Sequence, residues 1–149
     1  YNIERNVPFA DVLVGAVMIH GQKSPHVVSE AHVKRMRPGT VILDVSIDQG
    51  GCVETSRPTT HSDPIFVRHG VIHYAVPNIP GAVSNTSTYA LTNVTLRYAR
   101  AIAKLGLEEA VRRDDALRKG INVYKGKVTC DAVAQSAGEK TVELAALLG

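Results

Sequence analysis

The sequence predicts an α/β fold, in which a parallel β-sheet within residues 1–84 is followed by a helical segment in residues 85–149. The main observation is Val41–Ile47, an almost unbroken apolar run rich in β-branched residues. Such runs are typical of strands buried on both faces of a parallel sheet. A second observation is that apolar residues recur every three or four positions from Thr86 to Leu105, which indicates a long helix.

The first elements of the sheet can be placed in chain order. Ala10–Ile19 is a strand candidate, and Gly15 within it permits close approach of a backbone or a ligand. Ser29 is a suitable N-cap for a short helix over Glu30–Met36. Val41–Ile47 then completes a strand–helix–strand unit, whose crossover should be right-handed and whose strands should be parallel.

A long polar loop containing SRPTTHSDP (residues 56–64) separates the central strand from a third strand candidate, Val71–Val76. All three candidates run into polar, turn-forming stretches. In open α/β sheets, ligands bind outside the carboxyl ends of the strands, so this convergence is what a dinucleotide site needs. Many parallel sheets that bind nothing share the pattern, and the pattern alone leaves both interpretations open.

The helical segment is expected to hold a second helix over Glu108–Lys119, with acidic residues in its first turn and basic residues in its last. This arrangement complements the helix dipole. Ile121–Tyr124 and Lys127–Thr129 can pair as a small hairpin. Short helices over Asp131–Ala137 and Thr141–Leu147 complete the expected elements.

Composition and charge exclude several classes of protein. The 149 residues are 44% apolar and 21% charged, which is typical of a soluble globular chain. No apolar run approaches the roughly 20 residues that span a bilayer, and two cysteines are too few for a disulfide framework. We therefore expect a cytoplasmic protein with no membrane partner. The net charge of +3 is dispersed and Trp is absent, so nucleic acid is not an expected partner either.

Four side chains near the strand ends are candidates for chemistry or for structure. Asp48 follows the central strand directly, where an acid is well placed for chemistry, although a turn-capping aspartate fits the pattern equally. Asp44 should bond a neighbouring backbone or basic group, because burying it unpaired is costly. We interpret His73 as a hydrogen-bonded strand residue and Cys52 as a small buried side chain rather than a reactive thiol.

Part of a complete dinucleotide site is missing from the sequence. No GxGxxG phosphate loop occurs, so the pyrophosphate and adenine side cannot be located here. The six histidines lack metal-ligand spacings such as HExxH. The chain opens at Tyr1 rather than at a methionine, and it reads as a piece of a longer protein.

Three long motifs give the sequence a resemblance to a known family. They are GAVMIHGQKSP (15–25), DQGGCVETSRPTT (48–60) and NIPGAVSNTSTYALTN (78–93). Together they resemble alanine dehydrogenase, the NAD-dependent enzyme that interconverts L-alanine and pyruvate, and the resemblance weakens after about Gly106. It implies that residues 1–84 are the carboxyl-terminal half of a Rossmann-like NAD-binding domain, and that residues 85–149 are the helical carboxyl-terminal part of the substrate domain.

The resemblance also implies a reaction and a set of site residues. The family reaction is the reversible oxidative deamination of L-alanine to pyruvate and ammonia, with NAD as the cofactor. Asp48 matches the family's catalytic aspartate, which would position the nicotinamide ribose by accepting hydrogen bonds. The cofactor contacts implied by matching motifs are Val17, Met18, Val45, Ser46, Ile47, Asp48, Arg57, Val76, Pro77, Asn78 and Ile79.

The sequence departs from the family pattern in ways that matter. The family's acid–base and carboxylate-binding residues lie in segments that match nothing here, so this chain alone should be catalytically incomplete. His26 stands where relatives often carry a lysine beside the cofactor. Ala101 and Leu105 stand where some relatives carry metal-binding side chains, and we therefore expect no metal. Homo-oligomers, commonly hexamers, are implied by the family.

Two alternatives remain open at this point. The nucleotide-binding part of the NAD(P) transhydrogenase α subunit shares much of the pattern, although SRPTT (56–60) and TSTYALTN (86–93) favour alanine dehydrogenase. A non-catalytic binding or assembly remnant would also lack the phosphate loop and the acid–base residues. The unpartnered apolar stripe of the helical segment argues against that reading, because such a surface favours association.

Overall fold

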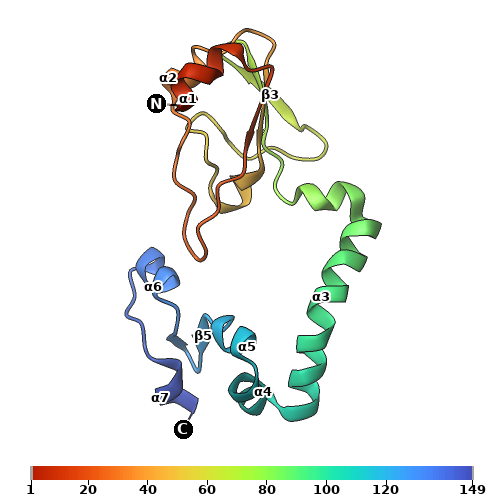
Figure 1. Cartoon of the computed structure of the whole chain (residues 1–149), viewed down its shortest axis with the longest axis vertical. Helices are drawn as coiled ribbons and strands as arrows, with labels where there is room; N and C mark the ends of the chain where they lie inside the picture. The colour runs from red at the N-terminus through yellow and green to blue at the C-terminus, as the bar shows by residue number, and fades with distance from the viewer. Residues whose placement is uncertain (1, 149) are drawn as a thin grey trace. The chain divides into compact units, whose positions relative to one another are not determined.

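The computed structural model describes residues 2–148, and the chain divides into two compact units, Tyr1–Ala82 and Val83–Gly149 (Figure 1). The first unit contains a four-stranded sheet in the order β1-β2-β4-β3. Three strands are parallel, β1 (Val12–Gly15), β2 (Val41–Asp44) and β4 (Val71–Tyr74), whereas β3 (Ile65–Arg68) is an antiparallel edge strand. The predicted α/β class with a parallel-sheet core is therefore confirmed.

The central strand is shorter than the sequence predicts. It ends at Asp44 rather than at Ile47, and Val45–Gln49 forms the 3₁₀ helix η2. The backbone N–H of Ser46 donates to Asp44 Oδ1 at 3.1 Å. Such a local side-chain bond offers the backbone an alternative to the strand ladder, so the expectation of a strand through Ile47 is wrong.

The edge strand β3 is absent from the sequence-based expectations, which have a polar loop leading to β4. Its Ile65 and Val67 side chains are exposed, so the strand is held by pairing with β4 and by the half-buried Phe66. The two strands are joined at His69 and Gly70, whose φ angles are both positive (54° and 76°), as in the tight turns that suit a twisted hairpin.

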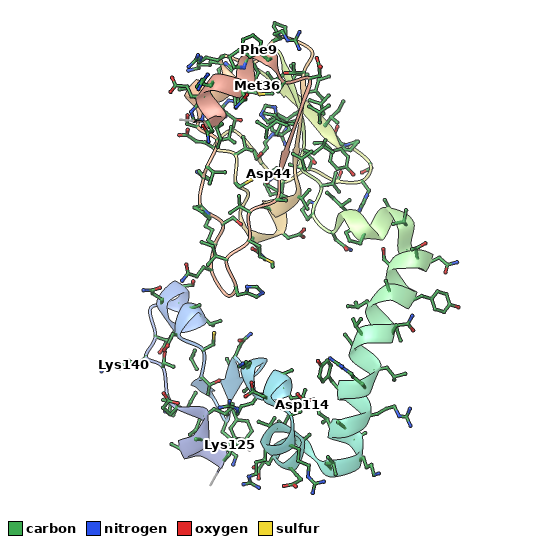
Figure 2. The ribbon with its side chains drawn as sticks, viewed as in Figure 1. Phe9, Met36, Asp44, Asp114, Lys125 and Lys140 are labelled. Atoms are coloured by element: carbon green, nitrogen blue, oxygen red, sulfur yellow. The ribbon has the colours of Figure 1, made fainter. Side chains whose placement is uncertain are left out.

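Asp44, labelled in Figure 2, is a fully buried charged residue of the first unit. Its Oδ1 accepts from Ser46 N, and its Oδ2 accepts from Cys52 N at 3.0 Å and from Val53 N at 3.1 Å. The expectation that Asp44 bonds neighbouring backbone is confirmed. Because these donors lie up to nine residues later in the chain, the carboxylate folds the segment after β2 back onto the end of the strand.

The core of the first unit forms around this folded-back segment. A Cβ atom on Gly15 would lie 2.4 Å from Cys52 Sγ, so the bare glycine at the end of β1 gives the cysteine its space. Short helices precede β1, namely α1 (Asn2–Asn6) and η1 (Val7–Phe9), and α2 (Glu30–Val33) connects β1 to β2. The core cluster comprises Val7, Val28, Val33, Met36, Ile42, Cys52, Val53 and Val71.

His73 is fully buried on β4 and has partners on both ring nitrogens. Its Nδ1 lies 3.0 Å from the carbonyl oxygen of Val71; because that oxygen can only accept, Nδ1 carries the proton. Nε2 then accepts from the Thr55 hydroxyl at 2.7 Å. The ring stacks on Phe66 of β3, with the centroids 4.8 Å apart. The interpretation of His73 as a hydrogen-bonded strand residue agrees with this arrangement.

The second unit is mainly helical. The single helix expected over residues 108–119 is divided, because Asp114 Oδ1 accepts from Ala116 N at 2.8 Å and caps a new helix. The expected hairpin is confirmed by antiparallel pairing of β5 with β6. The elements are α3 (Ser84–Leu105), α4 (Leu107–Arg113), α5 (Asp115–Lys119), β5 (Val123–Tyr124), β6 (Lys127–Val128), α6 (Asp131–Ala137) and α7 (Leu144–Leu148). Within residues 2–148, no helix is both long and apolar enough to cross a bilayer.

Replacing Asp44 by asparagine should destabilise the first unit by about 2–4 kcal/mol, because the amide presents N–H donors to backbone N–H groups that are then unsatisfied. Urea unfolding of the two chains measures the difference. Asp63→Asn, at an exposed loop carboxylate, is the matched control and should change stability by less than about 0.5 kcal/mol. Equal stability of Asp44→Asn and the unmodified chain would contradict the assigned role.

Stability should also depend on pH through His73, because burial lowers the pKa of His73 below its ordinary value of 6.5. Below about pH 6.5 the unfolded chain protonates residue 73 while the folded chain does not, so the free energy of unfolding falls until the pH reaches the folded-state pKa. His73→Gln should reduce this dependence between about pH 7.5 and pH 5.5 in urea titrations. His20→Gln is the control for loss of an exposed imidazole. If the free energy of unfolding of His73→Gln depends on pH as strongly as that of the unmodified chain, the assignment to His73 is contradicted.

Candidate functional site

A cavity of about 310 Å³ lies at the carboxyl ends of β1 and β2. Two segments form it: the residues that follow β1 and the η2 helix that follows β2. Five of the residues expected to contact a cofactor are among those that line it. The lining residues are Ala16, Val17, Met18, Val45, Ser46, Asp48 and Gln49.

Two buried serine hydroxyls hold the two walls of this cavity together. Ser46 Oγ donates to the carbonyl oxygen of Val17 at 2.8 Å, and Ser24 Oγ donates to the same oxygen at 2.9 Å. Ser24 N also donates to the Gln49 carbonyl at 2.9 Å. Because these bonds tie the segment after β1 to η2, they fix the spacing between the cavity walls.

Asp48 joins η2 to the loop that follows β4. The backbone N–H of Asn78 donates to Asp48 Oδ1 at 2.9 Å, and Asn78 adopts a left-handed conformation with φ of 53°. Its carbonyl accepts from Gly81 N at 2.8 Å, within the turn that begins η3 (Ile79–Val83). Asp48 is exposed, and its Oδ2 has no hydrogen-bond partner within residues 2–148. One carboxylate oxygen therefore holds the loop while the other faces solvent.

The remaining predicted contact residues are placed differently. Ile47 and Val76 are buried, so a ligand would meet their backbone rather than their side chains. Pro77 and Ile79 are half-buried beside Asn78. Arg57 lies over the Phe66 ring, with its guanidinium carbon 4.4 Å from the ring centroid, and it is not among the residues that line the cavity.

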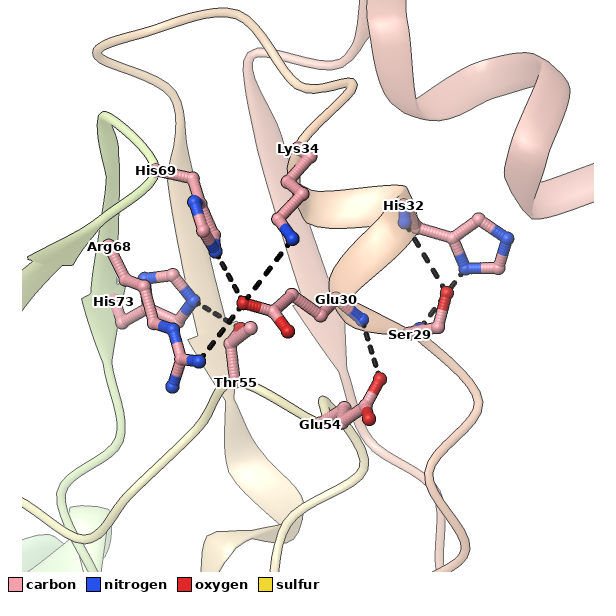
Figure 3. A network of polar contacts seen from close by, with 9 residues as sticks. All are labelled: Ser29, Glu30, His32, Lys34, Glu54, Thr55, Arg68, His69 and His73. Carbon is pink, nitrogen blue, oxygen red and sulfur yellow. Dashed lines mark hydrogen bonds and ion pairs between the residues drawn. The ribbon is translucent and has the colours of Figure 1, made fainter.

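The loop that follows the DQGG motif is braced by a polar network that Figure 3 shows. Glu54 Oε2 accepts from the backbone N–H of Glu30 at 2.7 Å, at the first residue of α2. The Glu30 carboxylate in turn accepts from His69 Nε2 at 2.6 Å and from Arg68 at 3.0 Å. The hydrogen bond from His69, followed by that from Arg68, lowers the pKa of Glu30. Helix α2 is thus linked to the loop after β2 and to the β3–β4 turn.

Cys52 lacks the properties of a reactive thiol. The side chain is fully buried, and burial raises the pKa of the Cys52 thiol above its ordinary value. The protonated thiol lies 3.5 Å from Asp44 Oδ1, toward which it donates. Across residues 2–148, no group of three or more His, Cys, Asp or Glu side chains is arranged to hold a metal ion.

Two side chains near the site were not singled out from the sequence. The stem of Lys23 lies against Gly50, directly after the cavity-lining Gln49. The imidazole of His61 lies against Gly81, in the loop that Asn78 begins. Both contacts are made across loops with no periodic pattern, so hydrophobic periodicity could not indicate them.

Comparison with known proteins identifies relatives of this chain. The family model described as alanine dehydrogenase/PNT, C-terminal domain, matches residues 1–131. An alanine dehydrogenase of Methanococcus maripaludis is 58% identical over 137 residues, which are 91% of this chain and 37% of that protein. An alanine dehydrogenase of Lysinibacillus sphaericus is 52% identical over 139 residues, which are 93% of this chain and 37% of that protein. The chain therefore spans little more than a third of the length of these relatives.

Solved structures agree with the sequence matches. An L-alanine dehydrogenase superposes with a TM-score of 0.77 at 48% identity, over 92% of this chain and 38% of the other. A transhydrogenase from Sinorhizobium meliloti superposes with a TM-score of 0.53 at 20% identity, over 58% of this chain and 24% of the other, which is a likeness of fold alone. Because the family model matches most of the sequence, this chain belongs to the alanine dehydrogenase/PNT C-terminal domain family.

Proposed function

We propose that this chain supplies the nicotinamide-side half of the NAD site of an alanine dehydrogenase, which reversibly deaminates L-alanine to pyruvate and ammonia. The observation that carries the proposal is the cavity at the carboxyl ends of β1 and β2, with Asp48 held at its wall by the Asn78 backbone. Ligands of open α/β sheets bind at this edge. The names of the relatives supply the substrate.

The cavity suits part of a dinucleotide rather than the whole molecule. At about 310 Å³ it lies at the small end of ligand pockets, which run from about 300 to 1,000 Å³. Val17, Met18 and Val45 offer an apolar wall against which a nicotinamide ring can lie, while Asp48 can accept from ribose hydroxyls. NAD, when bound, accepts the hydride from the amino-acid Cα. The other proposed contacts are Ser46, Ile47, Arg57, Val76, Pro77, Asn78 and Ile79.

We assign Asp48 the role of positioning the ribose and thereby the reacting ring. Its Oδ2 faces solvent and can accept hydrogen bonds, while Oδ1 already holds the loop after β4. Such placement acts on the rate through orientation, because a small misplacement of the reacting groups is costly. A general acid–base group and a cation for the substrate carboxylate must come from elsewhere in the enzyme. Assembly into a homo-oligomer and a cytoplasmic location are further parts of the proposal.

A chimera tests the proposed function directly. It joins the part of the Methanococcus maripaludis relative that this chain does not match to residues 1–149. We expect L-alanine-dependent formation of NADH, measured by absorbance. A folded chimera that binds NADH but forms none from L-alanine would overturn the assignment, and it would favour a transhydrogenase part or a non-catalytic module.

Two substitutions in the active chimera separate the roles of the Asp48 oxygens. Asp48→Asn keeps an acceptor for Asn78 N but removes the charge, and we expect kcat to fall about 100-fold, the scale of a misplaced reactant. Asp48→Ala removes both the acceptor and the charge, and kcat should fall at least as far. Asp63→Asn is the control for loss of an exposed carboxylate. Unchanged turnover in both Asp48 variants would remove the catalytic assignment.

The 149-residue chain alone should bind NADH weakly or not at all. It contains no GxGxxG sequence, the loop whose backbone N–H groups and helix end bind the pyrophosphate. Fluorescence titration with NADH measures this, with the chimera as the positive control. If the isolated chain bound NADH as tightly as the chimera does, residues 1–149 would be sufficient for cofactor binding, and the prediction would be wrong.

A further inference from the structure

Lys23 lies over the motif that carries Asp48, although no motif of the sequence singles it out. A Cβ atom on Gly50 would lie 2.6, 2.8 and 3.2 Å from the Cε, Cγ and Cδ atoms of Lys23. The lysine stem therefore occupies the space that a side chain at position 50 would need. Gly50 also has φ of 95°, a conformation that favours glycine. The absence of a side chain at Gly50 thus leaves room for the stem of Lys23.

The segment that carries Lys23 is fixed at the residue that follows it. Ser24 is buried, and its backbone N–H and its hydroxyl bond the carbonyl oxygens of Gln49 and Val17 at 2.9 Å each. Both Gln49 and Val17 line the cavity. The base of the Lys23 side chain is consequently held beside the cavity wall, and its stem runs along the residue that ends η2.

The Lys23 ammonium has no counter-charge among the residues that the structure describes. Neighbouring exposed cations of the same unit are paired: Lys34 with Glu30, Arg35 with Glu4 and Arg37 with Asp11. The exposed Lys23 side chain therefore carries an unpaired charge, which suits a ligand that brings the negative charge.

We propose that Lys23 binds an oxyanion of the ligand in the adjacent cavity and so helps to determine its specificity. The identity of the ligand rests on the proposed function: the oxyanion is either a phosphate of the dinucleotide or the carboxylate of the small acid. An ammonium group suits both, because it is a compact charge with three donors. The chain thereby supplies a cation beside the cavity, outside its lining residues, in addition to any that the rest of the enzyme contributes.

The test compares three variants of the chimera: Lys23→Met, Lys23→Arg and the control Lys34→Met, which removes a surface lysine at the C-cap of α2. If the oxyanion is a phosphate, Lys23→Met weakens NADH binding about tenfold in a fluorescence titration, equivalent to about 1.4 kcal/mol. Added salt should then weaken NADH binding less in Lys23→Met than in the unmodified chimera, because the variant lacks the charge pair that salt screens. If the oxyanion is the carboxylate, NADH binding is unchanged and KM for pyruvate rises about tenfold.

Lys23→Arg keeps the charge and should retain most of the affinity, which a purely structural role of the stem would not require. Thermal unfolding of Lys23→Met should match that of the control. Unchanged NADH binding together with unchanged KM in Lys23→Met overturns the inference. Because NADH binding is measured without turnover, a chimera that binds NADH through Lys23 but does not oxidise alanine would overturn the proposed function and leave the inference standing.

A second measurement uses the 149-residue chain and inorganic diphosphate as the probe. We expect the backbone amide signals of Lys23 and Gly50 to shift in an NMR titration, and we expect Lys23→Met to lose these shifts. The same amides should respond in Lys34→Met. Absence of any shift at Lys23 and Gly50 in the unmodified chain, together with an unchanged KM for pyruvate in the Lys23→Met chimera, overturns the inference.

Discussion

The Asp44 carboxylate determines the path of the chain at the carboxyl end of the central strand. It is closed off from solvent and accepts from the backbone of Ser46, Cys52 and Val53. A buried polar group without partners is costly, so the segment after β2 must return to supply these donors. The same return places η2 against the residues that follow β1, where the cavity lies. The geometry of the candidate site therefore depends on satisfying one buried charge.

Two aspartates four residues apart have opposite environments as a result. Asp44 directs both oxygens to buried backbone donors, whereas Asp48 is exposed and uses one oxygen to hold Asn78. Asp44 has a structural role, whereas Asp48 has an oxygen free to accept a hydrogen bond from a ligand. Sequence distance alone does not separate these roles. The change from strand to 3₁₀ helix at Val45 does, because it turns the second carboxylate away from the core.

The sequence was informative where periodicity and burial agree. The parallel strands and α2 follow from apolar runs and a cap, although all four elements are shorter than predicted, and α6 has the bounds expected for it. Local side-chain bonds account for two errors: Asp44 ends the strand early, and Asp114 divides the helix expected over residues 108–119. The exposed strand β3 carries little burial signal. At the site, motif resemblance pointed to the segments around Val17, Asp48 and Asn78, but the contact between Lys23 and Gly50 joins two loops and could be found only in three dimensions.

The contact between Gly15 and Cys52 has a consequence for how this family can vary. Any side chain at position 15 would come within 2.4 Å of the sulfur atom, and close-packed interiors resist such overlap. The two positions share one small volume between the end of β1 and the segment that Asp44 holds. A methyl group can therefore be accepted at position 15 only where position 52 becomes smaller. Across divergent relatives, positions 15 and 52 should covary, so that a larger residue at one accompanies a smaller residue at the other.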